Sequence, residues 1–405
     1  MRALEEAPFL DVFSPEFTEN PAPVVDELRS STALVRTPIG VLVIRRDVVQ
    51  ALLTDRRLRS AVPDIVRMQG VSDGLIHQLV GDSLLAQEGD GHARLRTLVN
   101  RAFTPRAVEP HRPVMREILQ GLLAPLYERG RCELMAEVAD HYPIQVMCAL
   151  LGVPDEDHED FARWNTALTW VLSFELGAHL EEALWGASQM DAYVARLIAE
   201  RRREPRDDLV TTLAQAEESG DRLSDGELRS LIAGLLFAGF DTTRNQLGLA
   251  MALFAERPDQ WALLVDRPDL VPQAVDEVMR VSGAVGLAPR LTVEDVEIAD
   301  HLVPAGTLVS LSLAAANYDP SVFVDPRDFD ITVVRAPHHT FGGGPHYCLG
   351  ANLARAEMQE ALLQLTALMP TFSLDGEPTW RTPMGIFGPQ TLPLRFTPGT
   401  AALSA

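Results

Sequence analysis

The sequence predicts a mainly α-helical protein with small β-sheets. Residues 224–256 have the pattern of one long helix, because a Ser-x-x-Glu capping box begins at Ser224 and Pro258 follows the end. At a rise of about 1.5 Å per residue, this helix would be roughly 48 Å long, enough to cross the molecule. Alternation typical of β-strands is found in residues 34–44, rich in Val and Ile, and in residues 290–312. These signals favour a helical body with β-structure near both ends of the chain.

The other segments are assigned in chain order from their periodicity and composition. Helical spacing of apolar residues is found in residues 22–30, 46–54, 91–102, 112–128, 132–151, 181–203, 272–281 and 349–368. Residues 64–88 are polar and contain several glycines, and residues 217–222 are polar, so both segments are predicted to be loops. Residues 392–396 are predicted to form a short terminal β-strand. The length of 405 residues alone would suggest two or three domains.

The charge pattern excludes several classes of protein. The formal net charge of −22 argues against a nucleic-acid-binding protein, which would carry a basic patch or stripe. All 35 basic residues are arginines. Without a lysine, the chain can form neither a phosphate-binding loop of the Walker type nor a Schiff base.

The cysteine count and the N-terminal composition indicate the compartment. Cys132, Cys148 and Cys348 are too few for a disulfide framework and fit a reducing environment. Acidic residues and prolines are scattered through the first part of the chain, so a signal peptide is not expected. The longest apolar run, residues 231–240, is about half of the ~20 residues that span a bilayer. We therefore expect a cytoplasmic protein without a membrane anchor.

A glycine-rich loop near the C-terminus carries the most informative chemistry. Residues 341–350 read Phe-Gly-Gly-Gly-Pro-His-Tyr-Cys-Leu-Gly and place Cys348 just before the predicted helix at 349–368. Glycine permits positive φ and a close approach of the backbone, which suits a large planar ligand. At a helix N-terminus, the dipole and the free N–H groups favour thiolate over thiol. A thiolate on an open loop can bind haem iron as an axial ligand.

Two other interpretations of Cys348 use the same residues. Cysteine is among the most commonly buried residue types, so Cys348 could be a structural core residue. It could also bind zinc together with His346, but the sequence contains no second Cys or His cluster at zinc spacing. Cys148, on an apolar helical segment, fits a core position, whereas Cys348 lies in a glycine loop.

The loop matches a known signature. The pattern F-x-x-G-x-H-x-C-x-G resembles the haem-binding signature of the cytochrome P450 family, and the order of elements agrees with that family over nearly the full length. The resemblance implies one domain over residues 1–405, of the soluble bacterial class, that holds heme b (iron protoporphyrin IX). It implies that Cys348 is the iron ligand. The further cofactor contacts that it implies are Ala238, Phe341, Gly342 and Gly350.

A second motif lies midway along the predicted long helix, in residues 238–243 (Ala-Gly-Phe-Asp-Thr-Thr). The Thr242 hydroxyl can donate to the Ala238 carbonyl and bend the helix. Cleavage of dioxygen consumes protons, and an acid–alcohol pair can supply them if Asp241 exchanges with solvent and Thr242 donates a hydrogen bond. Taken alone, the segment could equally be a polar patch on a core helix. The resemblance places Asp241 and Thr242 at the acid and alcohol positions of the family's oxygen-activation motif.

Two further sets of charged residues gain a role from the resemblance. Glu277 and Arg280 form an i, i+3 pair, which by itself would be an exposed ion pair worth under ~1 kcal/mol. In the family this pair is buried and supports the cysteine loop. The two propionates of a haem need cationic or hydrogen-bonding partners if they are buried. The positions that the resemblance assigns to these partners are His92, Arg96, Arg290 and His346.

The resemblance also locates a substrate pocket, above the haem face opposite the thiolate. The predicted lining residues are Leu84, Leu85, Trp170, Phe174, Phe237, Val285, Leu287, Ile386 and Phe387. Because these side chains are apolar, the predicted substrate is a neutral, lipophilic molecule such as a terpenoid, steroid, polyketide or fatty-acid derivative.

The resemblance implies a haem-thiolate monooxygenase that uses dioxygen to hydroxylate or epoxidise such a molecule. The short stretch after Cys348 resembles no flavin or nicotinamide fold, so electrons are expected from a ferredoxin and an NAD(P)H-dependent ferredoxin reductase. Arginines expected to attract an acidic ferredoxin are Arg101, Arg106, Arg112, Arg116 and Arg355. Three alternatives remain open: a peroxygenase, an oxidative ring-coupling enzyme on the same fold, and a non-catalytic haem-binding sensor.

Overall fold

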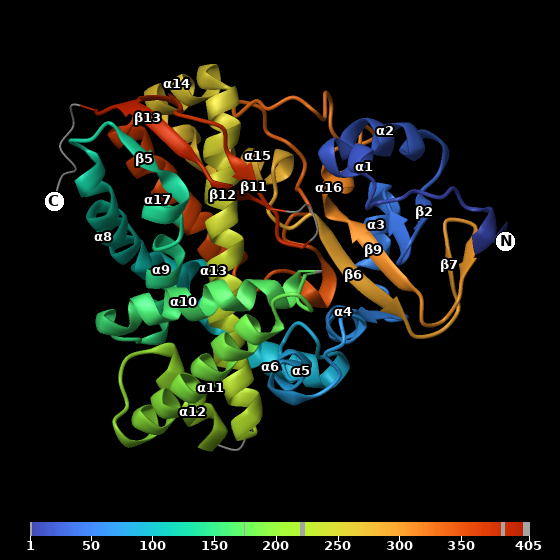
Figure 1. Ribbon diagram of the computed structural model, residues 1–405, viewed down its shortest axis with the longest axis horizontal. Coiled ribbons are helices and arrows are strands. Elements are labelled where there is room, and N and C mark those ends of the chain that lie inside the picture. The colour runs from blue at the N-terminus through green and yellow to red at the C-terminus, as the bar shows by residue number, and fades with distance from the viewer. Residues whose placement is uncertain (1, 174, 219–222, 382–384, 400–405) are drawn as a thin grey trace.

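The computed structural model describes residues 2–173, 175–218, 223–381 and 385–399. Figure 1 shows two sides: helices gather around α13 (Asp225–Glu256), which runs through the left of the view from top to bottom, and most long strands lie at the right. The predicted mainly α-helical fold with small sheets is confirmed.

The helices supply most of the apolar core. In chain order they are α1 (Pro15–Glu19), α2 (Pro21–Ser31), α3 (Arg46–Leu52), α4 (Val62–Met68), α5 (Gly74–Gly81), α6 (Gly89–Asn100), α7 (Pro105–Val108), α8 (Arg112–Leu123), α9 (Tyr142–Leu151), α10 (His158–Leu168), α11 (Leu180–Arg203), α12 (Leu209–Glu218), α13, α14 (Pro258–Asp266), α15 (Val271–Val281), α16 (Leu313–Asn317) and α17 (Ala351–Leu368). Short 3-10 turns connect several of them, including Gly344–His346 just before Cys348.

The strands of the described residues form one larger sheet and three small ones. The larger sheet has the order β2-β3-β9-β6-β4, in which β3 and β9 are parallel and the other pairs are antiparallel. Its strands are β2 (Leu34–Thr37), β3 (Gly40–Val43), β4 (Leu58–Ser60), β6 (Leu287–Thr292) and β9 (Leu308–Ser312). The small sheets contain β1 (Arg2–Ala3), β5 (Arg131–Glu133), β7 (Val296–Ile298), β8 (His301–Val303), β10 (Thr371–Leu374), β11 (Thr379–Trp380), β12 (Pro389–Thr391) and β13 (Pro393–Thr397).

The central helix α13 begins as its sequence predicts. The Ser224 hydroxyl accepts the N–H of Glu227 at 3.1 Å, and the Glu227 carboxylate accepts the N–H of Ser224 at 2.7 Å, which is a complete capping box. Every side chain in residues 243–252 is buried. A helix that is buried on all faces lies inside the helical side rather than on its surface.

Two segments differ from the sequence prediction. Residues 64–88, predicted as a loop, contain most of α4 and all of α5, because Val66 and Ile76 give each short helix a buried face, and these faces pack into the core. Residues 132–151, predicted as one helix, contain part of β5, a π-helical turn at Met135–Ala139 and α9. Pro143 lies in the first turn of α9, where a proline starts a new helix readily. Of the predicted loop at 217–222, residues 219–222 lie outside the described residues.

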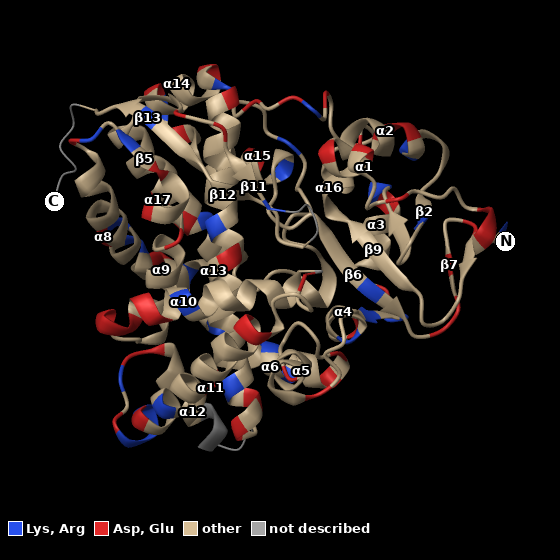
Figure 2. Cartoon of the chain, viewed as in Figure 1, with Lys and Arg blue, Asp and Glu red and all other residues tan. Residues whose placement is uncertain are grey.

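The apolar interior has separate parts on the two sides of the molecule. One large cluster of buried side chains joins the helices, and a second cluster lies between the five-stranded sheet and α3. Charged residues of both signs are interspersed along the chain in Figure 2 rather than gathered by sign. Among the described residues, no helix is long and apolar enough to cross a membrane.

Candidate active site

A large cavity lies where α13, the five-stranded sheet and the loop of residues 341–350 meet. Its volume is about 490 Å³. Each residue that the sequence assigned to the cofactor lines it: His92, Arg96, Ala238, Arg290, Phe341, Gly342, His346, Cys348 and Gly350. The structure therefore brings together side chains from α6, α13, β6 and the cysteine loop.

Cys348 stands on a tight loop that glycines make possible. Its N–H donates to the Phe341 carbonyl at 2.9 Å and closes the loop. Gly342 and Gly344 have φ angles of 71° and 63°, a left-handed conformation that costs other residues about 1 kcal/mol or more. A Cβ on Gly344 would also lie 2.3 Å from the Leu53 carbonyl oxygen. The loop therefore rests directly on the end of α3.

Two opposing effects act on the protonation of Cys348. The helix α17 begins at Ala351, so Cys348 precedes its first turn, and the thiol is exposed to the cavity. Burial within the surrounding protein raises the pKa of the Cys348 thiol, and the Gly350 N–H, Arg96 and Arg355 oppose this only in part. Burial therefore opposes the thiolate form that the position before the helix favours. A cation bound at the sulfur would hold the thiolate form.

Basic side chains line the cavity without a full set of partners. Arg290 is 7% exposed, and within the described residues its guanidinium makes one hydrogen bond, to the Pro289 carbonyl at 3.0 Å. The buried Nε2 of His92 has no hydrogen-bond partner in the same part of the chain. Burial lowers the pKa of Arg290, of Arg96 and of His92. An anionic group in this part of the cavity would satisfy these donors.

His346 completes the basic cluster and brings one carboxylate into it. The rings of His346 and His92 lie 4.5 Å apart, and His346 Nε2 lies 3.1 Å from a carboxylate oxygen of Glu88. Glu88 also accepts the N–H of Ser60 at 2.6 Å. Burial raises the pKa of Glu88, but these two hydrogen bonds and the charges of His346 and Arg290 together lower it overall. The sequence analysis missed Glu88, which it left in a segment predicted as a loop.

Comparisons with known proteins agree with this arrangement. The family model for cytochrome P450 matches residues 70–264 and 265–385. The chain belongs to the cytochrome P450 family. It is 39% identical to luteothin monooxygenase of Streptomyces thioluteus over 395 residues. This aligned region covers 96% of each chain. It is 40% identical to mycinamicin IV hydroxylase/epoxidase of Micromonospora griseorubida over 369 residues. This aligned region covers 89% of this chain and 91% of the relative.

A solved structure shares the whole architecture. The bacillaene polyketide synthase cytochrome P450 PksS of Bacillus subtilis 168 superposes with a TM-score of 0.86 at 30% identity, over 95% of this chain and 98% of the other. As a cytochrome P450 with monooxygenase and hydroxylase relatives, the protein is an oxidoreductase whose cofactor is heme b.

The cavity of this P450 fits that cofactor. The unpartnered Nε2 of His92 and the free donors of Arg290 suit the two propionates. The Cys348 thiol opens to the same cavity, where it can reach an iron ligand position. Among the described residues, no group of three or more His, Cys, Asp or Glu side chains forms a competing metal site.

The polar motif of α13 divides between the cavity and the protein interior. Thr242 lines the cavity, and its hydroxyl donates to the Ala238 carbonyl at 2.7 Å, as predicted. α13 continues through this point as one helix. Gly239 has a role that the sequence did not reveal: a Cβ there would lie 2.6 Å from the Met147 sulfur, so the glycine lets α9 pack close to α13.

Asp241 lies behind Thr242 and is not open to solvent. It is 1% exposed, and Arg381 donates to both of its carboxylate oxygens, at 2.8 and 3.0 Å. The Asn245 amide donates to the same group at 3.0 Å. Burial raises the pKa of Asp241, while Arg381 and Arg244 oppose the rise. Proton exchange between Asp241 and solvent stays a prediction: the carboxylate is buried, whereas the side chain of its partner Arg381 is 21% exposed.

Some of the residues predicted for the substrate pocket line the cavity, and others do not. Leu84, Leu85, Phe237, Val285, Leu287 and Ile386 line the cavity. Trp170 does not, because it stacks on His179 at 3.6 Å and donates to Glu182. Phe387 is also outside the lining, where its ring stacks on Trp380 at 5.6 Å. Phe174 lies outside the described residues.

The pair Glu277–Arg280 is buried, as the resemblance implied. Both side chains are 1% exposed, and Arg280 donates to the two carboxylate oxygens at 2.7 and 2.8 Å. Its other donors reach the carbonyls of Asn317, Pro326 and Asp328. The pair thus ties α15 to the segment that precedes the cysteine loop.

The cavity residues that the sequence analysis did not assign include Thr243 and Glu357. Glu357 follows Leu353 by one helical turn, so its place on the apolar face of 349–368 was visible as a signal.

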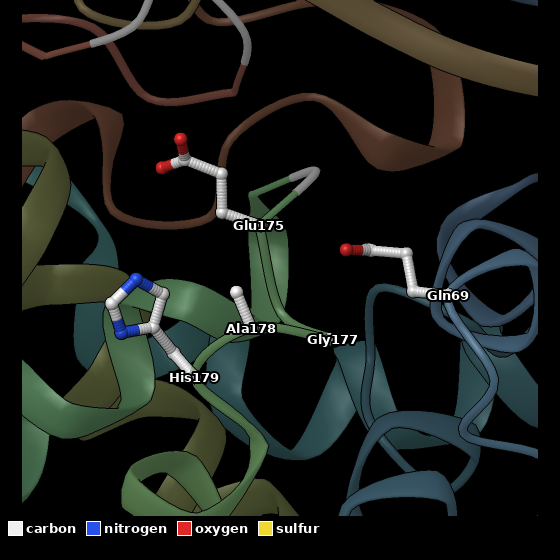
Figure 3. Close-up of a pocket in the computed structure, with 5 residues that line it drawn as sticks. All are labelled: Gln69, Glu175, Gly177, Ala178 and His179. Atoms are coloured by element: carbon white, nitrogen blue, oxygen red, sulfur yellow. The ribbon is translucent and has the colours of Figure 1, made fainter.

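A second, shallow pocket lies elsewhere, lined by Gln69, Glu175, Gly177, Ala178 and His179 (Figure 3). It contains none of the predicted site residues.

Proposed function

We propose that this cytochrome P450 inserts one oxygen atom of dioxygen into a neutral, lipophilic secondary metabolite, such as a polyketide, terpenoid, steroid or fatty-acid derivative. The observation that carries the proposal is the shared cavity: Cys348 and Thr242 open into the same largely apolar space. The printed names of the relatives, a luteothin monooxygenase and a mycinamicin IV hydroxylase/epoxidase, support hydroxylation or epoxidation of a complex natural product.

The residues around the cavity would have three roles: holding the cofactor, supplying protons and orienting the substrate. Bound haem would supply dioxygen activation, which a thiolate ligand favours by donating electron density. Cys348 would provide that thiolate. The groups that would hold the propionates are His92, Arg96, Arg290 and His346. Thr242 would donate a hydrogen bond to dioxygen, and Asp241 would supply protons to Thr242 through the interior. The described apolar lining would exclude water and orient the substrate.

Electrons would come from a ferredoxin and its NAD(P)H-dependent reductase, in the cytoplasm as the sequence predicts. Of the predicted arginines, Arg101, Arg106 and Arg116 are exposed, and the structure gives no ion pair for Arg101 or Arg106 among the described residues. Arg112, Arg116 and Arg355 pair with acids: Arg112 and Arg116 with Glu360, and Arg355 with Asp276. Arg101 and Arg106 are therefore the groups best able to attract an acidic partner.

The ferredoxin proposal is tested by steady-state kinetics. Replacing Arg101 and Arg106 with alanine should raise the KM for ferredoxin severalfold and flatten its salt dependence, with kcat unchanged. Arg203→Ala, at the exposed end of α11, is the matched control and should change neither value. Equal KM values in the double variant and the wild type would place the docking surface elsewhere.

The monooxygenase proposal is tested first by the visible spectrum of the reduced, carbon-monoxide-bound protein. A thiolate-type Soret band that is lost in Cys348→Ser, but kept in Cys132→Ser, would support Cys348 as the ligand. A histidine-type spectrum that Cys348→Ser leaves unaltered would overturn it.

Next, Thr242→Ala should uncouple NAD(P)H consumption from product formation, whereas a peroxygenase would turn over with hydrogen peroxide and be indifferent to this change.

A further inference from the structure

Gln246 is a polar residue in the buried stretch of α13, and it lines the cavity. It is 5% exposed. Its side chain makes two hydrogen bonds to a distant part of the chain: Nε2 donates to the Ser282 carbonyl at 2.8 Å, and Oε1 accepts the Ala284 N–H at 3.0 Å. Because one partner is an acceptor and the other a donor, the orientation of the amide is fixed. Gln246 therefore clamps the backbone of residues 282–284 to the central helix.

The clamped segment connects α15 to β6. Residues 282–286 lie outside both of these elements, so their backbone groups are not part of either hydrogen-bond pattern. Ala284 is nevertheless 2% exposed, and buried backbone groups need hydrogen-bond partners. Gln246 thus supplies to this connection the hydrogen bonds that a helix or a strand would otherwise provide.

A second segment of the cavity wall is tied to the first. The Ala284 carbonyl accepts the Phe387 N–H at 2.9 Å, and Val285 forms an antiparallel bridge with Ile386. Ala284, Val285 and Ile386 all line the cavity. Two wall segments that are far apart in the sequence are therefore positioned from one side chain of α13.

The clamp is close to the oxygen motif along the helix. Gln246 follows Thr242 by four residues, and residues four apart lie on the same face of a helix. Both residues line the cavity. The clamp therefore sets the apolar walls relative to the turn of α13 that carries Thr242. Displacing a reacting group by about 1 Å can lower a rate about a hundredfold, so the placement of these walls matters for the reaction.

We propose that Gln246 is a positioning residue that determines how the substrate is oriented. By clamping residues 282–284, it fixes Val285 and Ile386 relative to Thr242, and the walls so placed select the carbon of the substrate that faces the oxygen. The inference rests on the proposed function, because the orientation of a substrate has a consequence only if the cavity holds one. Gln246 takes part in no chemical step and acts through the wall residues.

The first experiment reads the clamp itself and requires neither turnover nor substrate. Gln246→Leu nearly keeps the volume of the side chain and removes both hydrogen bonds. In the haem-loaded variant, the Ala284 amide should exchange with deuterium about tenfold or more faster than in the wild type. Gln273→Leu is the matched control, because Gln273 on α15 donates to the Ile331 carbonyl at 2.7 Å and is outside the cavity lining. This control should leave the Ala284 rate unaltered.

The second experiment reads ligand selection with imidazole and clotrimazole, two azoles whose nitrogen binds haem iron and shifts the visible spectrum. Imidazole is a small ring, whereas clotrimazole carries bulky aromatic groups that must contact the cavity walls. Gln246→Leu should raise the Kd for clotrimazole roughly tenfold and change the Kd for imidazole by less than about twofold. Gln273→Leu should change neither Kd.

Gln246→Glu provides a rescue that keeps the test valid if Gln246→Leu does not fold. The protonated acid can donate to the Ser282 carbonyl and accept the Ala284 N–H, whereas the ionised acid cannot donate. Burial favours the protonated form. Compared with the wild type at the same pH, this variant should bind clotrimazole almost normally at about pH 6 and about tenfold more weakly at about pH 9.

Each outcome distinguishes positioning from a structural role. An unchanged Ala284 exchange rate in Gln246→Leu would overturn the clamp. Equal changes in the two Kd values, or faster exchange with an unchanged clotrimazole Kd, would overturn the positioning role, because Gln246 would then merely stabilise the fold. A wild type that gives the expected exchange and binding results, but oxidises no NADPH with a surrogate ferredoxin and reductase, contradicts the proposed function rather than the clamp.

Discussion

At the scale of single residues, the site depends on polar groups that are buried without ordinary partners. Arg290, His92 and Glu357 each keep hydrogen-bonding capacity in the cavity wall that the described residues leave unused. His92 and Arg290 were assigned to the haem propionates only through the resemblance to the family, and Glu357 was not assigned. The position of Glu357 on the apolar face of its helix can be read from the sequence, but only the structure shows that its Oε1 has no hydrogen-bond partner among the described residues.

Glu357 should make the stability of the protein depend on pH. Its ordinary pKa of 4.5 rises to about 8 in the folded state, so the folded protein binds more protons than the unfolded chain between these values. The contribution of Glu357 to the free energy of unfolding is therefore greatest below pH 4.5. It falls as the pH rises toward 8, by at most about 1.4 kcal/mol per pH unit. Urea unfolding of wild type and Glu357→Gln should show the variant's relative stability increasing with pH. A constant difference would contradict this.

Arg96 should matter for cofactor retention in a way that its neighbour Arg94 does not. Arg96 lines the cavity, whereas Arg94 pairs with Glu227. Losing one hydrogen bond to a propionate should speed haem loss by roughly ten- to a hundredfold. Transfer of haem to apomyoglobin, compared for Arg96→Gln and Arg94→Gln, measures this. Similar rates for the two variants would remove Arg96 from the propionate site.

At the scale of elements, long periodic segments were predictable and short ones were not. The helices α13 and α17 follow from capping and spacing within their own residues. The short helices α4 and α5 depend on contacts with distant segments, which local pattern cannot contain. The same limit applies to α10, α12 and α14, which the sequence analysis did not assign.

Gln69 is the clearest example of such a distant contact. At the end of α4, its amide donates to the Ser173 carbonyl at 2.8 Å and accepts the Leu176 N–H at 2.9 Å, and Figure 3 shows its side chain extending toward that segment. Gln69→Ala should speed hydrogen exchange of the Leu176 amide by about tenfold or more, for a loss of roughly 1–2 kcal/mol of local stability. Gln78→Ala, on the exposed face of α5, should leave it unaltered. An unchanged Leu176 rate in Gln69→Ala would show that other contacts hold the segment.

At the scale of the whole molecule, the helical side and the sheet side meet around the cavity, and the segment after α16 leads the chain back to the cysteine loop. Arg280 anchors that segment through three backbone carbonyls while it neutralises Glu277. The sequence showed the pair, but only the resemblance showed that it is buried.

Removing Arg280 should therefore affect both stability and the site. Arg280→Met leaves Glu277 buried without its principal partner, a change that commonly costs about 3–5 kcal/mol. The expected result is a lower urea midpoint together with partial loss of the thiolate-type spectrum. Arg163→Met, which removes an exposed i, i+3 pair with Asp160, should leave both unaltered. A destabilised Arg280→Met protein that keeps a full spectrum would uncouple this anchor from the cysteine loop.

The placement of the three cysteines gives the protein a chemical reporter of its own. Cys132 and Cys148 are buried, so neither thiol is accessible to a reagent in the folded state. Cys348 is exposed to the cavity. In folded protein lacking cofactor, a maleimide should therefore attach once per chain, and a ligand bound at the sulfur should block it. The labelled fraction, read by mass spectrometry, would count the molecules that have not yet received haem.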